Sequence, residues 1–286
     1  MDITSNKTFT YKELYRFTNR VFLGLGQIIL QKNAFAGLLI LLAFLVSDIT
    51  IGLAVLVATV VGTLIARLLN FRNAHTDNGL YGFNAALVGA AMFYFFQPNL
   101  LLWIWMPFFS GIATLVYHFF LTRDIPVYTL PFIVIIWVIL RFTPVGLLSE
   151  QHDSISSAAI MDYYYIIRGF GQIVFQSEIL SGLLIFLALV VGSRWAALYT
   201  LCACILSGFV ALSLGIESDL TNNGLFAFNP ILCAVVFAGP GLTNAVNVGI
   251  AVVLSMVLSA MMIKAGYVQL TFPFVASCWI TGVLKR

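Results

Sequence analysis

Long apolar stretches separated by short polar breaks dominate the chain. Two of them, residues 78–122 and 220–263, contain no Asp, Glu, Lys or Arg. A helix needs about 20 mostly apolar residues to cross a bilayer, so each stretch has room for two spans and a short turn. Dividing the chain at its polar, Gly and Pro positions predicts ten helical spans, some of them short or interrupted. They are expected to begin near residues 21, 49, 80, 100, 126, 166, 195, 225, 244 and 267.

The positions of Lys and Arg predict how these spans are oriented. The polar tail over residues 1–20 is basic and is therefore placed on the cytoplasmic side. Its basic residues are Lys7, Lys12, Arg16 and Arg20. Alternating ten spans from there returns the C-terminus to the same side and puts an acidic linker, residues 143–165, outside the cytoplasm. Arg141 and Lys264 go against this pattern. We therefore expect a multi-pass protein of the cell inner membrane with both termini cytoplasmic.

Three sequence motifs occur twice, in the same order. The pairs are GLGQIILQKNAFAGLL at 24–39 with GFGQIVFQSEILSGLL at 169–184, NGLYGFNAAL at 78–87 with NGLFAFNPIL at 223–232, and YTLPF at 128–132 with LTFPF at 270–274. The offset is 145 residues for the first two pairs and 142 for the third. Ordered matches of this kind indicate an internal duplication. The two membrane repeats are assigned to residues 21–142 and 166–286.

Charges at the ends of the spans predict that the second copy is inverted in the membrane. Arg72 has Glu217 as its counterpart, and the region equivalent to Asp48 contains Arg194. Basic ends in one half thus become acidic ends in the other, as an odd number of spans per half would produce. The predicted fold is an all-α integral membrane protein with ten transmembrane helices in two inverted five-helix repeats. Such repeats place a substrate site near the membrane midplane, often between broken helices.

Composition supports the membrane assignment and excludes several functions. Hydrophobic residue types make up 61% of the chain and charged types 9%, whereas soluble domains carry about 25% charged residues. The formal charge of +3 comes with no sustained basic patch, so no nucleic-acid partner is expected. The four cysteines lie in apolar stretches without metal or disulfide spacing. No acid–base pair or nucleophile constellation occurs, so we expect neither an enzyme nor a cofactor.

The paired Gly-X-Gly-Gln, Asn-Gly-Leu and Thr-X-Pro-Phe motifs, in this order, resemble those of the urea transporter family. The resemblance covers residues from about 20 to 284. It implies a homotrimer with one pore in each protomer and channel-like, passive permeation of urea. It also implies five spans and a tilted re-entrant or broken pore helix in each half.

The chemistry of two glutamines agrees with this resemblance. Urea is flat and neutral, with four N–H donors and one carbonyl acceptor, so its pore needs hydrogen-bond acceptors and flat apolar walls. Gln27 and Gln172 are matched amides in otherwise apolar helices, where a side-chain oxygen can begin a row of acceptors. By the resemblance, each heads such an oxygen ladder. The alternative is that each amide forms a structural hydrogen bond between helices.

Apolar walls are expected from residues near the repeated motifs. Phe83 and Leu87 lie one helical turn apart and so share a face, as do their counterparts in the second repeat. By the resemblance, the walls include Leu30, Phe83, Leu87, Phe175, Phe228 and Leu232. Phe175 has Leu30 as its repeat mate, which predicts an asymmetric aromatic clamp. Core packing is the alternative role for each of these side chains.

Other polar residues in the repeats have two interpretations. Thr129 and Thr271 each precede a proline by two positions; the resemblance places their hydroxyls at the pore centre. Alternatively, each satisfies a carbonyl freed by the proline. Asn84 and Asn229 are read as structural, tying discontinuous helices together. Glu178 stays unresolved between a functional carboxylate within the membrane and a helix start near the surface.

Two other transport mechanisms would each need a particular set of titratable residues. An ion-coupled transporter of a small neutral amide or similar solute would need carboxylates or histidines within the membrane. Glu178 and Asp48 are the carboxylate candidates for that role. An ammonium channel would need a pair of histidines in one pore. The chain has three histidines, His75, His118 and His152, and no two of them are repeat mates. Downhill flow of urea is therefore the favoured prediction.

Overall fold

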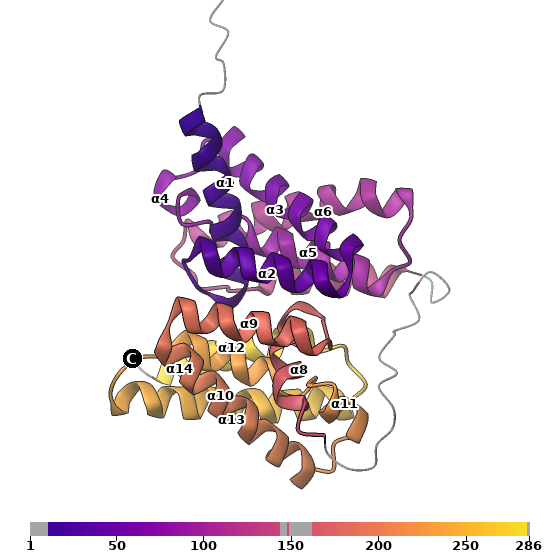
Figure 1. The fold of residues 1–286 in the computed structure, drawn as a ribbon, viewed down its shortest axis with the longest axis vertical. Coiled ribbons are helices and arrows are strands. Elements are labelled where there is room, and N and C mark those ends of the chain that lie inside the picture. The colour runs from indigo at the N-terminus through magenta and orange to yellow at the C-terminus, as the bar shows by residue number, and fades with distance from the viewer. Residues whose placement is uncertain (1–10, 144–147, 149–161, 285–286) are drawn as a thin grey trace, which may run out of the picture.

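A computed structural model describes residues 11–143, 148 and 162–284 of the chain, and most of these residues are helical (Figure 1). Within these ranges there is no strand, and a single isolated bridge joins Phe96 to Leu148. The expected linker over 143–165 lies mostly outside the described residues, as do residues 1–10 of the expected tail. An all-helical architecture with apolar helices is thereby confirmed.

The helices follow the same order in the two halves of the chain. The first half contains α1 (Tyr11–Gly26), η1 (Gln27–Ile29), α2 (Ala34–Ser47), α3 (Ile49–Leu68), α4 (Asn73–Thr76), α5 (Phe83–Phe95), α6 (Leu100–Leu121) and α7 (Leu130–Phe142). The second contains α8 (Tyr165–Gly171), η3 (Gln172–Val174), α9 (Ile179–Gly192), α10 (Arg194–Ser213), α11 (Ser218–Asn222), α12 (Phe228–Phe237), α13 (Leu242–Lys264) and α14 (Phe272–Leu284). The first helix begins at Tyr11, ten residues before the expected first span at residue 21.

Helix length separates the apolar helices into two kinds. Among the described residues, four helices are long and apolar enough to cross a membrane: α3, α6, α10 and α13. Six segments qualify if the bent pairs α1–α2 and α8–α9 each count as one. The shorter apolar helices α5, α7, α12 and α14 have 10 to 13 residues. At 1.5 Å per residue they reach at most about 20 Å, less than the roughly 30 Å hydrocarbon core.

Apolar side chains also cover the outside of the molecule. Leu53, Leu64 and Leu101 are examples of large apolar residues that are exposed on the long helices. The α2 helix contains no charged residue along its 14 positions. Helices that are hydrophobic all round belong in the core of a large protein or in lipid. Since these side chains are exposed, lipid is the solvent that suits them.

Both bent pairs break at the same place in their repeat. The axis turns by 74° between α1–η1 and α2, and by 77° between α8–η3 and α9. Leu30 and Phe175 end the two 3-10 helices with left-handed backbone, at φ 58° and φ 61°. A non-glycine residue in this region is strained and is retained where the surrounding structure fixes it. After each break, Asn33 or Glu178 precedes the next helix.

Two glycines allow the helices flanking each break to touch. A Cβ placed on Gly37 would lie 1.8 Å from the carbonyl oxygen of Phe22, and one on Gly182 would lie 2.0 Å from that of Ile167. Both distances are far below any van der Waals contact. The bend therefore needs glycine at these two matched positions, where the start of one helix lies against the backbone of the preceding one.

Unusual backbone conformations repeat with the same offsets as the sequence motifs. Ten of the eleven described residues with positive φ form five pairs. The pairs are Leu30 with Phe175, Asn70 with Gly215 and Gly79 with Gly224, at offset 145, and Asp124 with Gly266 and Tyr128 with Leu270, at offset 142. Side-chain identity differs within most pairs, so the match lies in backbone geometry. The two halves of the chain thus share a local fold.

The two halves meet along α2 and α9, which lie side by side (Figure 1). The Ser181 hydroxyl on α9 donates a hydrogen bond of 2.7 Å to the carbonyl of Ala43 on α2. At one end of this pair, Ser47 bonds to Gln176. At the other, the Gln31 side chain contacts Gly192. In the same view, α4 lies at the left of the molecule and α11, its counterpart, at the right.

Candidate functional site

Two buried threonine hydroxyls, one from each half, form a hydrogen bond with each other. The Oγ1 atoms of Thr129 and Thr271 lie 2.7 Å apart, and both residues are buried. Each threonine stands directly before an apolar helix that has proline in its first turn. One sequence interpretation had each hydroxyl bonding a carbonyl freed by the proline; the structure instead pairs the two hydroxyls with each other.

Buried asparagines hold the backbone around these threonines. The Asn84 amide donates a 3.1 Å hydrogen bond to the carbonyl of Tyr128, and its oxygen accepts one of 3.2 Å from the backbone N–H of Phe132. Asn229 makes the equivalent two bonds in the second half, each 3.1 Å long. The asparagines thus link α5 to the start of α7 and α12 to the start of α14. The structural role predicted for both residues is confirmed.

Left-handed backbone aims the threonines toward each other. Tyr128 and Leu270 precede them, with φ values of 48° and 45°. Each such conformation costs on the order of 1–3 kcal/mol in a non-glycine residue. The carbonyls of these two residues are the ones that the asparagine amides bind. The asparagine amides therefore hold the two strained turns in place. In this conformation the two threonine hydroxyls face one another across the boundary between the halves.

The matched glutamines differ in their bonding. Gln27 is buried, and its Nε2 donates a 2.9 Å hydrogen bond to the carbonyl of Asn78. Gln172 is also buried but its side chain forms no hydrogen bond with any described residue. Gln27 therefore makes a structural hydrogen bond, which was the alternative role predicted for it. Its side-chain oxygen remains available as an acceptor. The whole amide of Gln172 is available to a ligand.

A cavity of about 270 Å³ opens beside Gln172. Both halves of the chain line it: Tyr94 and Phe95 come from the end of α5, and Phe175 and Phe228 come from the second half. None of its described lining residues is Asp, Glu, His, Lys or Arg. The cavity therefore suits a small neutral molecule that can bond to an amide and lie against aromatic rings.

Phe175 is surrounded by aromatic side chains of the other half. Its ring centroid lies 5.2 Å from that of Tyr94, 6.1 Å from Phe95 and 6.2 Å from Phe132. Offset and edge contacts of this kind stabilise aromatic pairs. Leu30, the repeat mate of Phe175, is half-buried and is not among the residues lining this cavity. Aromatic contacts are therefore concentrated around Phe175, and its repeat mate in the first half, Leu30, does not have the same position in this cavity.

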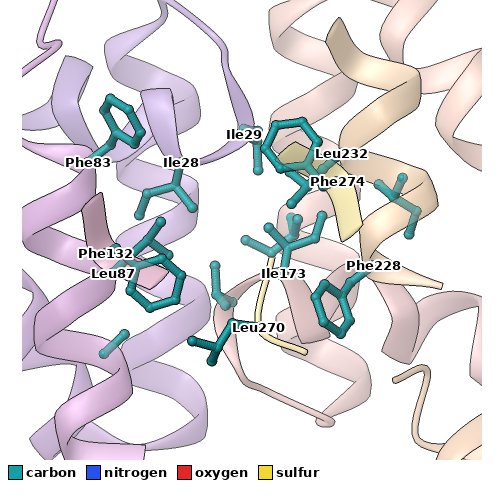
Figure 2. Packing of buried hydrophobic residues seen from close by; sticks show 14 of the residues in the cluster. Ile28, Ile29, Phe83, Leu87, Phe132, Ile173, Phe228, Leu232, Leu270 and Phe274 are labelled. Carbon is teal, nitrogen blue, oxygen red and sulfur yellow. The ribbon is translucent and has the colours of Figure 1, made fainter. Parts of the chain in front are cut away.

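The remaining predicted wall residues are buried on both sides of the boundary. Phe83 and Leu87 are each 2% exposed, Phe228 6% and Leu232 1%. Figure 2 shows Phe83 and Leu87 on helices of the first half and Phe228 and Leu232 on helices of the second, with Leu270 between them. Of the predicted site residues, the cavity brings together Gln172, Phe175 and Phe228. The other predicted site residues do not line this cavity.

A third glutamine was missed by the comparison of repeats. Gln269 lines the cavity, and its Nε2 donates a 2.9 Å bond to the carbonyl of Leu225. Its Oε1 accepts a 3.3 Å bond from the amide of Asn229. The residue 142 positions earlier is the buried Val127, so no matching amide drew attention to it. An amide inside an apolar stretch was the available signal.

The two carboxylates considered for ion coupling lie at helix starts. Glu178 is exposed and stands directly before α9. Asp48 is exposed and caps α3, its Oδ1 accepting bonds from the backbone N–H groups of Thr50 and Ile51. Neither lines the cavity beside Gln172. For Glu178, the structure agrees with the helix-start interpretation.

The threonine contact predicts a measurable energetic coupling. Thr129→Val and Thr271→Val keep the side-chain shape and remove one hydroxyl each. Either substitution breaks the same hydrogen bond. The double variant should therefore lose less free energy of unfolding than the two single variants lose together. The expected difference is about 0.6 kcal/mol, typical of hydrogen bonds between membrane helices. Reversible unfolding in mixed micelles would measure this coupling.

A distant threonine supplies the control for this cycle. The Thr200 hydroxyl bonds the carbonyl of Ala197 within α10. Combining Thr200→Val with Thr129→Val should give additive losses, because the two sites share no partner. Additive losses in the Thr129–Thr271 cycle as well would show that their hydroxyls do not bond in the membrane.

Comparisons with known proteins bear on nearly the whole chain. A family model described as "Urea transporter" matches residues 18–286. Urea transporter 1 of Mus musculus is 26% identical over 246 residues, and that of Ovis aries is 27% identical over 249 residues. Each alignment covers 78% of this chain and 63% of the relative. The chain therefore spans less than two thirds of the length of these relatives.

Proposed function

This chain belongs to the urea transporter family, a family of membrane transporters rather than enzymes, and from this premise we propose that it conducts urea passively across the cell inner membrane. Urea moves through a narrow pore between the two halves of each protomer. The apolar helices and the family together make the chain a multi-pass membrane protein. Urea, the bilayer and two further copies in a homotrimer are the proposed partners.

The cavity beside Gln172 is the observation that supports this proposal most. It offers the unbonded amide of Gln172 and aromatic faces, and the described part of its lining contains no charged group. Urea can donate N–H groups to the amide oxygen while its flat faces lie against Phe175 and Phe228. A hydrated ion would lose its water there without receiving a charged partner, which is costly. The cavity thus favours a flat, neutral, hydrogen-bonding solute.

The proposed path continues from this cavity through the boundary between the halves. The hydroxyl pair of Thr129 and Thr271 stands at its narrowest point and must part to let urea pass. Beyond it, the acceptor at the opposite mouth is the oxygen of Gln27. The proposed lining, from one mouth to the other, comprises Gln27, Leu30, Phe83, Leu87, Thr129, Thr271, Leu232, Phe228, Phe175 and Gln172.

We assign the two halves to inverted repeats, with ten transmembrane helices in all and both termini cytoplasmic. The opposite positions of α4 and α11 in Figure 1 support the inversion. The five pairs of positive-φ residues mark equivalent turns in the two halves and support the repeat itself. Helices too short to cross a bilayer are typical of pores built from broken segments, in which two half-helices share one crossing.

A flux experiment tests the proposal as a whole. Purified protein in liposomes should carry urea down its gradient at a rate unaffected by a protonophore, because none of the described residues lining the cavity is a carboxylate or histidine that would couple the solute to protons. Stopped-flow light scattering would measure the flux, with protein-free liposomes as the control. Accumulation of urea against its gradient when a proton gradient is imposed would contradict passive flow and favour an ion-coupled transporter.

A further inference from the structure

We propose that the first half carries a binding site for a phosphate group, separate from the urea path. The site is a cavity of about 360 Å³ at the end of α3 and beside α4. Three arginines line it: Arg20 from α1, Arg67 from α3 and Arg72 at the start of α4. Guanidinium groups bind phosphate through paired N–H donors, so three that converge on one cavity favour a multiply bonded phosphate.

Two of the three arginines pair with acidic residues among those that the structure describes. Asp77 pairs with Arg20, whose Nε donates a 2.8 Å bond to Oδ1. Glu13 approaches Arg67 at 3.9 Å. Arg72 is exposed and forms no ion pair with any described residue. At least one guanidinium in the cavity is therefore available to an anion.

A neighbouring cavity of about 470 Å³ adds to the positive charge. It shares Arg20 and Asn73 with the first and adds Arg16, together with Asp77, the partner of Arg20. The amides of Asn70 and Asn73 form no side-chain hydrogen bonds within the described part of the chain, so they remain as further donors in the first cavity. The site thus combines charge with neutral donors, as phosphate recognition requires.

Comparison of the repeats shows that the fold does not need Arg67 or Arg72. At the 145-residue offset, Arg20 corresponds to Tyr165, Arg67 to Leu212 and Arg72 to Glu217. The second half nevertheless builds the same helices around these positions. The contact of Arg20 with Asp77 has a structural equivalent, because Arg168 bonds the carbonyl of Asn222, the counterpart of Asp77. Arg67 and Arg72 have no arginine at their matched positions, so their placement beside the cavity is better explained by a ligand than by folding.

The phosphate group could belong to a lipid headgroup or to a soluble phosphate. Leu68 and Leu69, next to Arg67, are 68% and 54% exposed, so an acyl chain could lie beside a headgroup held in the cavity. Basic pockets at the cytoplasmic ends of membrane helices bind anionic headgroups in this way. The cytoplasmic position of the cavity rests on the proposed topology, whereas its binding of phosphate does not.

Thermal unfolding of the full-length protein in nanodiscs tests the site. Three conditions are compared: phosphatidylcholine discs, the same discs with added inorganic phosphate, and discs containing phosphatidylglycerol. The variant Arg67→Gln/Arg72→Gln removes two of the guanidinium groups. Arg194→Gln is the control, because Arg194 is exposed and does not line the cavity. Arg72→Gln alone changes only an exposed residue. It provides a test of the site even if the double variant does not fold.

The proposal predicts saturable stabilisation of the unmodified protein and of Arg194→Gln. Half-saturation should require at least about tenfold more ligand in Arg67→Gln/Arg72→Gln, with a smaller change in the same direction in Arg72→Gln. A response to inorganic phosphate identifies a soluble phosphate; a response only to phosphatidylglycerol identifies a lipid headgroup. Equal responses in all four proteins, or an equal loss in Arg194→Gln, would overturn the site. Because the readout is binding, the result does not depend on urea transport.

Discussion

Replacing Gln172 by Leu is expected to lower urea flux roughly 5- to 150-fold without preventing membrane insertion. A urea N–H that reaches this point has been stripped of water, and the side-chain oxygen is the proposed replacement. An unmade hydrogen bond of this kind costs about 1–3 kcal/mol, which at a barrier gives the stated range of rates. Leu has similar bulk and suits an apolar site. Stopped-flow flux per inserted protein in liposomes would measure the effect.

Two comparisons make this result interpretable. Gln97→Leu makes the same chemical change at an exposed residue outside the cavity, so its flux should match the unmodified protein. Gln27→Leu should lower flux too, but it also leaves the Asn78 carbonyl without its 2.9 Å bond, so a loss of stability is expected beside the loss of flux. Normal flux through well-inserted Gln172→Leu would remove Gln172 from the proposed path.

Substituting Gly182 by Ala should destabilise the protein by about 3 kcal/mol, the upper end of typical overpacking losses. The added methyl would lie 2.0 Å from the carbonyl oxygen of Ile167 and 2.8 Å from its carbonyl carbon. Both are backbone atoms of α8, so no side-chain rotation can make room. The contact between α8 and α9 must open, which would displace the turn containing Gln172. Unfolding in mixed micelles would measure the loss.

A second glycine in a helix serves as the control. Gly249 lies within α13, is exposed, and would have no heavy atom within 4 Å of an added Cβ. Gly249→Ala should therefore be neutral or stabilise slightly, by up to about 1 kcal/mol. Equal stability of the two variants would mean that α8 and α9 do not approach as closely as described.

The pattern of apolar positions predicted most helices, and that some are interrupted, but not where the sharp bends lie. Every expected span start except the first lies within five residues of an observed helix start. The first was placed too late because α1 begins in the polar segment at Tyr11, which a search for apolar runs passes over. The sharp bends after Gln27 and Gln172 depend on backbone contacts at Gly37 and Gly182, which hydrophobicity does not encode.

The candidate site was predicted best where the repeats agree. Asn84 and Asn229, which are repeat mates, were assigned a structural role because buried amides need hydrogen-bond partners, and their matched bonds confirm it. Gln269 was missed because its counterpart is Val127. The contact between Thr129 and Thr271 could not be foreseen, because it depends on how the two halves pack against each other rather than on either half alone.

The unequal glutamines have a consequence for how the protein responds to the two aqueous solutions. Gln27 shares its amide with the Asn78 carbonyl, whereas Gln172 has a free amide and Gln269 beside it. A passive pore must still bring urea to equal concentrations on both sides, whatever the difference between its mouths. Its half-saturating concentrations need not be equal, and a bulky urea analogue should block more strongly from the Gln172 mouth. The direction in which the protein is inserted would then decide which compartment can regulate it.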